Sequence, residues 1–89
     1  MISKTTRRFR DVLAQLPKDI QRQAQESYKL FSQDSNHPSL RFKKVHTIEP
    51  IWSARINIDY RALGFIDGEE IIWFWVGSHA EYDKLLAKL

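Results

Sequence analysis

The stretch YRALGFIDGEEIIWFWVGSHAEYDKLL, residues 60–86, decides the fold. Two runs of strand-forming residues, 60–66 and 71–76, flank an Asp-Gly pair of the kind that hairpin turns prefer. The second run is apolar on both faces, which is typical of an interior strand that is covered on both sides. A short helix is expected directly after Gly77, because Ser78 and Glu81 have the spacing of a capping box.

Two further strands are expected upstream of this stretch, since apolar and polar residues alternate there with a period of two. Residues 51–58 are predicted to place Trp52, Ala54, Ile56 and Ile58 on one face and Ser53, Arg55 and Asn57 on the other. Residues 40–48 are predicted as the first strand, with Leu40 and Phe42 opposite Arg41 and Lys43. The Glu-Pro pair at 49–50 separates the two strands.

The N-terminal part has helical periodicity. Thr5 or Thr6 is expected to cap a first helix, whose apolar stripe is Phe9, Val12, Leu13 and Leu16. Pro17 separates it from a second helix with the stripe Ile20, Ala24, Ser27, Tyr28 and Phe31. The prediction is a single α+β domain, residues 1–89. It has an N-terminal antiparallel helical hairpin packed on a four-stranded, mainly antiparallel sheet, and a short C-terminal helix.

Composition narrows the possible functions. With 89 residues the chain supports one core, so an active site is expected to be a shallow surface cleft. Without cysteine it has no disulfide and no thiolate zinc site. No signal peptide and no apolar run of about 18 residues is present, so a soluble cytoplasmic protein without a membrane partner is expected.

Charge is unevenly distributed along the chain. Residues 1–46 hold ten lysines and arginines against four acidic residues, whereas residues 47–89 hold four against seven. This asymmetry suits a polyanionic partner, although helix surfaces are also often basic without any such role.

The outward face of the predicted sheet concentrates cations. If Arg55 and Arg61 share that face, two guanidinium groups lie on adjacent strands, and Arg41 and Lys43 add to them. Like charges held close together are unfavourable unless an anion offsets them, and phosphate matches the guanidinium fork. The alternative is that Arg55 and Arg61 form ion pairs with Asp59, Glu49 or Glu70.

His79 and Tyr82 lie in the first turn of the last helix, on one helical face. The positive end of the helix dipole favours a neutral imidazole, which can accept a proton from a hydroxyl group. The phenol of Tyr82 can donate a hydrogen bond to a phosphate oxygen or stack on a base. The alternative is that His79 is an ordinary helix-terminal residue and Tyr82 anchors the core.

Other candidate residues are weaker. Trp73 and Trp75 could stack on bases, but on an interior strand they are expected to belong to the core. His37 and His46 do not have metal-ligand spacing, and no metal or other cofactor is expected.

The order of elements resembles that of the RelE/ParE superfamily, the toxins of bacterial type II toxin–antitoxin pairs. The similarity extends to HPSLRFKKV, YRALGFIDGEEIIWFWVGSH and HAEYDKLL, and covers roughly residues 4–89. The RelE- and HigB-like branch is the most similar, because YR opens its third strand and a VG-x-H-x-x-Y pattern closes its fourth.

The resemblance implies a small RNase that needs no metal and acts on messenger RNA at the ribosome. In this family the 2′-hydroxyl attacks the adjacent phosphodiester, usually leaving a cyclic phosphate. The resemblance places Arg61 at the phosphorane, His79 where the family has an arginine or histidine, and Tyr82 at the C-terminal tyrosine. An antitoxin partner in a hetero-oligomer is also implied.

The sequence departs from the RelE branch in its second strand, where WSAR replaces the usual lysines and leaves Arg55 as the only cation. Lys43 and Lys44 of the preceding strand are expected to substitute, and with Arg41 to bind RNA. Two alternatives remain at this point. One is a non-enzymatic inhibitor of DNA gyrase, as in the ParE branch, and the other is an inactive relative that serves as a binding module in a repressor complex.

Overall fold

The computed structural model describes residues 1–89 and has the chain order βααββββα, with a short 3-10 turn before the second strand. The strands are β1 (Ile2–Thr5), β2 (Lys43–Lys44), β3 (Ile51–Arg55), β4 (Tyr60–Asp67) and β5 (Glu70–Ser78). The helices are α1 (Arg7–Gln15), α2 (Lys18–Gln33) and α3 (His79–Lys88). The strands form one sheet in the order β1-β5-β4-β3-β2, antiparallel except where β1 runs parallel to β5. The predicted α+β class is confirmed.

The strand count of four is wrong, because β1 adds a fifth. Residues 2–5 have only Ile2 as an apolar residue, so neither periodicity nor composition marks them as a strand. Their conformation depends on pairing with β5, including the bonds from Ile2 N to Glu69 O and from Thr6 N to Trp73 O. This pairing places β5 inside the sheet, as its two apolar faces predicted.

Helical side chains cover the free edge of β1. The hydroxyl of Tyr28 donates to the carbonyl of Ser3 at 3.3 Å, and Nη1 of Arg10 donates to the carbonyl of Thr5 at 2.7 Å. These bonds occupy carbonyl groups that an added strand would otherwise use. Tyr28 is therefore 43% exposed and lies at the margin of the core, although the helical stripe placed it inside.

The predicted strand 40–48 is reduced to Lys43–Lys44. Residues Pro38–Leu40 form a 3-10 turn that buries Leu40, and Arg41 follows in the left-handed conformation with φ 46°. Beyond β2 the ring of His46 accepts hydrogen bonds from the backbone N–H groups of Ile48 and Glu49. Local side-chain bonds of this kind compete with strand pairing, so the alternating pattern overstated the strand.

The predicted strand 51–58 ends at Arg55 for a similar reason. The side-chain oxygen of Asn57 accepts from the backbone N–H groups of Asp59, at 2.8 Å, and Tyr60, at 2.9 Å. This Asx-type turn links β3 to β4. It also leaves Ile58, predicted to point inward, 69% exposed.

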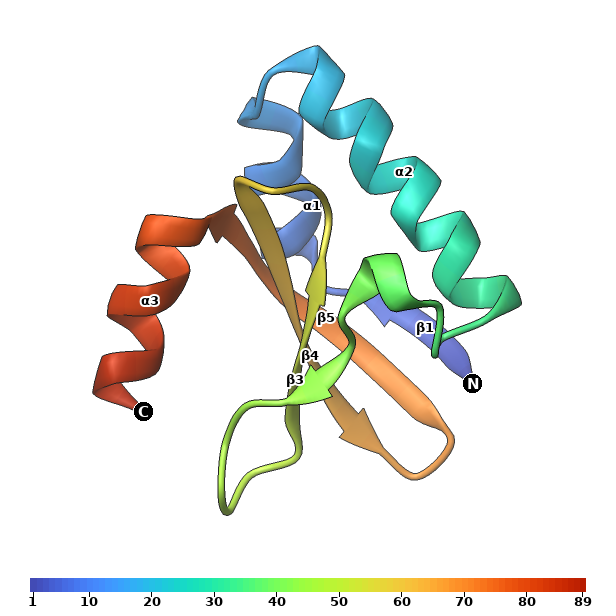
Figure 1. The fold of residues 1–89 in the computed structure, drawn as a ribbon, viewed down its shortest axis with the longest axis vertical. Coiled ribbons are helices and arrows are strands. Elements are labelled where there is room, and N and C mark those ends of the chain that lie inside the picture. The colour runs from blue at the N-terminus through green and yellow to red at the C-terminus, as the bar shows by residue number, and fades with distance from the viewer.

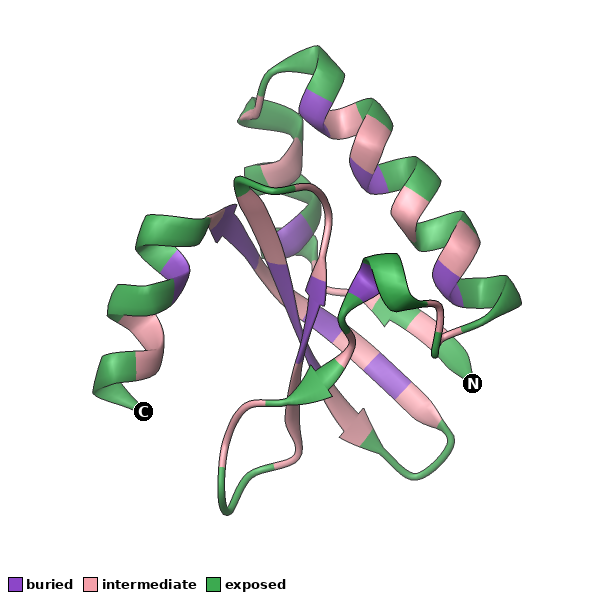
Figure 2. Ribbon diagram, viewed as in Figure 1, coloured by how far each residue is buried: buried purple, intermediate pink, exposed green.

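The two faces of the sheet carry different layers (Figure 1). Helices α1 and α2 run up and back down over one face, here called the hairpin face, and α3 lies on the opposite side, here called the α3 face. The buried positions of all three helices lie on the sides that face the sheet, whereas the outer sides of the helices are exposed (Figure 2).

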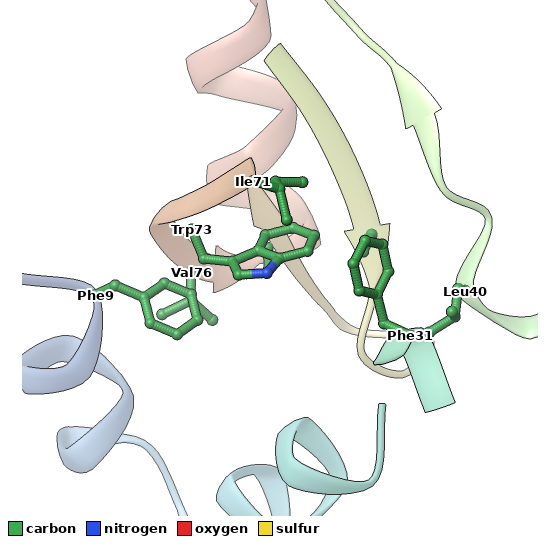
Figure 3. Packing of buried hydrophobic residues seen from close by; sticks show 8 residues of the cluster. Phe9, Phe31, Leu40, Ile71, Trp73 and Val76 are labelled. Atoms are coloured by element: carbon green, nitrogen blue, oxygen red, sulfur yellow. The ribbon is translucent and has the colours of Figure 1, made fainter. Parts of the chain in front are cut away.

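The core lies between the helical hairpin and the sheet. Figure 3 shows the Trp73 indole between Phe9 and Phe31, and Trp73 meets Phe31 edge to face at a centroid distance of 5.3 Å. The full cluster is Phe9, Phe31, Leu40, Ala54, Ala62, Ile71, Trp73 and Val76. Since Ala54 and Ala62 point into this core, the neighbouring residues Ser53, Arg55 and Arg61 point to the α3 face.

Candidate active site

The α3 face contains a polar hollow of about 170 Å³ beside the start of α3. Sheet register forms it, because Arg55 pairs with Arg61 across β3 and β4, and Lys43 pairs with Ser53 across β2 and β3. The residues that line it are Arg41, Lys43, Ser53, Arg55, Arg61, His79 and Tyr82. Six of the seven residues proposed from the sequence therefore converge there, and we call this group the cationic hollow.

Arg61 is held by the turn between β3 and β4. Its Nη1 donates to the carbonyl oxygens of Asn57, at 2.6 Å, and Tyr60, at 2.9 Å. Burial, and then the neighbouring Arg55, lower the pKa of Arg61 below its usual value. Arginine remains protonated at neutral pH even so. The guanidinium is thus a fixed positive charge at the edge of the hollow.

The cations of the hollow have no acidic partners. The three ion pairs of the structure are Lys4–Glu70, Arg7–Asp11 and His79–Asp83. Pairing of Arg55 or Arg61 with Asp59, Glu49 or Glu70 is therefore wrong, and Glu70 instead binds Lys4 at 2.9 Å across the β1–β5 pair. The four positive charges repel one another because no acidic side chain offsets them, and this repulsion favours the binding of an anion.

Arg41 and Lys43 enter from the segment before β3. The left-handed backbone of Arg41 is uncommon for a residue with a side chain, and such conformations gather at functional sites. Lys43 faces the hollow opposite Ser53, whereas Lys44 has the opposite parity, pairs with Trp52 and does not line the hollow. The structure thus brings together two of the three basic residues proposed to bind RNA.

His79 is the first residue of α3 and is fixed from two sides. Its backbone N–H donates to the carbonyl of Asp59 at 2.6 Å, which ties the helix start to the β3–β4 turn. Its Nδ1 lies 3.1 Å from Oδ2 of Asp83, one helical turn on. In the neutral ring this contact keeps the proton on Nδ1 and leaves Nε2 as an acceptor. Asp83 was not among the predicted site residues, although its i,i+4 spacing from His79 can be read from the sequence.

Tyr82 is buried against the α3 face of the sheet and also lines the cationic hollow. The residue is only 6% exposed, and its hydroxyl donates to Oγ of Ser53 at 3.2 Å. Its ring centroid lies 5.9 Å from that of His79. Ser53 was predicted to face outward but received no role, because a single serine on a strand carries no distinguishing sequence signal.

The remaining sequence candidates lie elsewhere. Trp73 is buried in the core, and Trp75 lies over Gly77, where a Cβ atom would come within 2.7 Å of its ring. Neither tryptophan lines the hollow. No group of three or more His, Asp or Glu side chains is arranged to hold a metal ion. None of the helices has the length and apolar character needed to cross a membrane.

The capping box that starts α3 gives a pH-dependent prediction. Hydrogen bonds to Ser78 lower the pKa of Glu81 below 4.5, so its ionised form stabilises the folded state. This contribution is present above the unfolded-state pKa and is lost as the pH falls through the folded-state value. Between about pH 7 and about pH 3, Glu81→Gln should therefore lose less stability than the wild-type protein, as measured by urea unfolding. Equal losses in both proteins would contradict this role for the carboxylate.

Comparisons with known proteins agree with this architecture. The family model for a ParE-like toxin domain matches residues 18–84. No curated protein sequence matches the chain. The fold is similar to YafQ from E. coli BL21(DE3), with a TM-score of 0.71 and 8% identity over 90% of this chain and 94% of that one. It is also similar to RelE–RelB from Methanococcus jannaschii, with a TM-score of 0.69 and 19% identity over 92% and 96% of the two chains. For isolated E. coli RelE the TM-score is 0.66, with 10% identity over 99% and 98%.

Proposed function

The chain belongs to the RelE/ParE superfamily of type II toxin–antitoxin toxins, and on this premise we propose that it is a metal-independent endoribonuclease that cleaves messenger RNA on the ribosome. The observation that carries the proposal is the cationic hollow, where four basic side chains without acidic partners surround an anion-sized space next to an imidazole. Cleavage would inhibit translation in the cytoplasm.

The residues of the hollow supply the groups that RNA cleavage requires. His79 removes the proton of the 2′-hydroxyl through Nε2, while Asp83 holds the other ring nitrogen. The 2′-oxygen then attacks phosphorus, and Arg61 and Arg55 stabilise the negative charge that develops on the phosphorane. Tyr82 supplies the proton for the leaving 5′-oxygen. The products are a 2′,3′-cyclic phosphate and a 5′-hydroxyl.

The RelE branch usually has lysines in the strand that corresponds to β3, and this chain has none there. Lys43 on the neighbouring strand β2 takes their place. It lies directly opposite Ser53 in the register of β2 and β3 and lines the same hollow. A cation on the neighbouring strand therefore occupies the same region as a lysine on β3 would. This arrangement favours the nuclease over an inactive binding module.

The position of Lys43 and Lys44 on opposite sides of one strand gives a matched prediction. For a non-cleavable 2′-deoxy oligonucleotide, Lys43→Ala should reduce the slope of log K against log salt by about 0.7, the value for one lost phosphate contact on a single strand. Lys44→Ala removes the same charge from the other side of β2 and should leave the slope within error of wild type. Equal slope changes in both variants would contradict the assigned geometry.

The expected partner is a cognate antitoxin that blocks the hollow. In solved complexes from Methanococcus jannaschii and Pyrococcus horikoshii, the RelE chain has a fold similar to this one and is bound to RelB, which is an antitoxin. Charge complementarity requires an acidic segment against Arg41, Lys43, Arg55 and Arg61. The basic first half of the chain is expected to contact ribosomal RNA phosphates.

Expression of the chain without an antitoxin tests the proposal. The expected result is growth arrest with cleaved messenger RNA and intact DNA. Arrest with DNA damage and intact messages would instead indicate inhibition of gyrase, as in the ParE branch. Unaffected growth would indicate a binding module without catalytic activity.

A further inference from the structure

Ser53 is the one polar residue in the buried interior, with an exposed fraction of only 3%. It lies at the middle of β3 and lines the cationic hollow, so it is a buried residue at the wall of the proposed site. Burial of a hydroxyl group is unfavourable unless it forms hydrogen bonds. A small aliphatic residue would fill the same space at lower cost, which raises the question of what this hydroxyl does.

The hydrogen bonds of Ser53 are only half used within the protein. Its Oγ accepts from the hydroxyl of Tyr82 at 3.2 Å, and no protein atom accepts the proton of Ser53 itself. A hydroxyl group can accept and donate at the same time. The pair therefore forms a directed chain, from Tyr82 to Ser53 and from Ser53 toward the hollow, where a substrate oxygen is the available acceptor.

We propose that Ser53 is a catalytic residue that passes the proton of Tyr82 to the leaving 5′-oxygen of the RNA. This inference rests on the proposed function, and it assigns Tyr82 an indirect role as the proton source behind Ser53. The observation that carries it is the buried Tyr82–Ser53 hydroxyl pair in the wall of the cationic hollow.

The proton transfers balance. The 2′-hydroxyl gives its proton to Nε2 of His79 and forms the new bond to phosphorus. As the bond from phosphorus to the 5′-oxygen breaks, that oxygen takes the proton of Ser53, and Ser53 takes the proton of Tyr82. The resulting phenolate lies close enough to Arg61 for their charges to interact, so the guanidinium stabilises it. Proton exchange with water then restores neutral His79 and protonated Tyr82.

A sulfur-substituted message separates this role from a purely structural one. Once the cleavage site in a short message is mapped on programmed ribosomes, the 5′-bridging oxygen of that linkage is replaced by sulfur. A thiolate is a good leaving group without protonation, so loss of the proton donor should matter only for the oxygen substrate. Wild-type protein should cleave both messages.

Ser53→Ala should slow cleavage of the oxygen message by about 100-fold, the lower end of the range for general acid catalysis. It should cleave the sulfur message within about threefold of the wild-type rate. Tyr82→Phe removes only a hydroxyl and keeps the buried ring. It should give the same pattern, and it replaces Ser53→Ala as the test if that variant folds poorly. The double variant should be no slower than either single variant, because both remove one chain of proton transfer.

Ser27→Ala is the matched control. Its hydroxyl is also partly buried and donates to the carbonyl of Ile56 at 3.1 Å, on the opposite face of the sheet from the hollow. It should cleave both messages like wild type.

Any one of four results would overturn the inference. Wild-type rates on the oxygen message for Ser53→Ala, or equal losses on both messages, would exclude proton transfer through Ser53 while leaving the nuclease proposal intact. A large loss in Tyr82→Phe with none in Ser53→Ala would show that Tyr82 acts directly. Failure of wild-type protein to cleave either message would overturn the proposed function and this inference together.

Discussion

Replacement of Arg61 by alanine is expected to lower the rate of RNA cleavage by about 10² to 10³-fold, the usual effect of losing one group that stabilises developing negative charge. Arg61 is the partly buried cation whose Nη1 is fixed by the β3–β4 turn. A positioned charge of this kind needs no reorganisation when the phosphorane forms. Single-turnover cleavage of message on programmed ribosomes measures the effect, and Arg61→Lys should show a smaller loss because it keeps the charge without the fork.

The same substitution also removes hydrogen bonds from the turn, so a stability control is required. Arg61→Ala is expected to lower the free energy of unfolding by about 1–2 kcal/mol. Asn57→Ala loosens the same turn by removing the acceptor for the backbone N–H groups of Asp59 and Tyr60, but it keeps the guanidinium. It should match the stability loss, and its loss of rate should be smaller than that of Arg61→Ala because the guanidinium is still present. An Arg61→Ala protein that folds and cleaves at the wild-type rate would contradict the role of this residue.

Replacement of His79 by alanine is expected to slow cleavage by about 10² to 10⁴-fold, the range for loss of a general base. The residue is on the first turn of α3, where the Asp59 carbonyl and the Ser78–Glu81 capping box fix the backbone. The side chain is 48% exposed, so its removal should leave the free energy of unfolding nearly unchanged. Rate and urea unfolding measured on the same preparation separate the two effects.

Asp83 provides the internal comparison for His79. Asp83→Asn keeps the size of the side chain but loses the carboxylate at Nδ1, so the imidazole is held less firmly with its proton on that nitrogen. We expect a smaller loss of rate than for His79→Ala, and no additional loss when Asp83→Asn is combined with His79→Ala. Additive losses would show that Asp83 acts independently of the ring.

Local sequence patterns predicted the elements whose formation depends on local chemistry. The Asp-Gly turn, the two apolar faces of β5 and the capping box of α3 all correspond to the structure. β1 was missed because it is a strand only through its parallel pairing with β5, which no local pattern records. The sequence nevertheless held a clue to β1. β5 was predicted to be an interior strand, and an interior strand needs a paired strand on each side.

The candidate site shows the same division between local and non-local information. Helical spacing predicted that His79 and Tyr82 lie together. Alternation left open whether Arg55 and Arg61 share a face, and the register between β3 and β4 shows that they do. Alternation placed Lys43 with Arg41 on the outward face, but Lys44 was also expected to bind RNA, and the register between β2 and β3, which the chain does not reveal, places only Lys43 at the hollow. The proposed role of Ser53 depends on its contact with Tyr82, which is 29 residues away in the sequence.

The end groups of the cleaved RNA test the central claim, that the cationic hollow directs a 2′-hydroxyl onto the neighbouring phosphodiester. Wild-type protein is incubated with ribosomes that carry a defined message, or the same message with a single 2′-deoxy nucleotide at the cleaved position, and the fragments are analysed by mass spectrometry. We expect cleavage of the first message alone, with a 2′,3′-cyclic phosphate on one fragment and a 5′-hydroxyl on the other. Cleavage of both messages, or fragments with 3′-hydroxyl and 5′-phosphate ends, would contradict it.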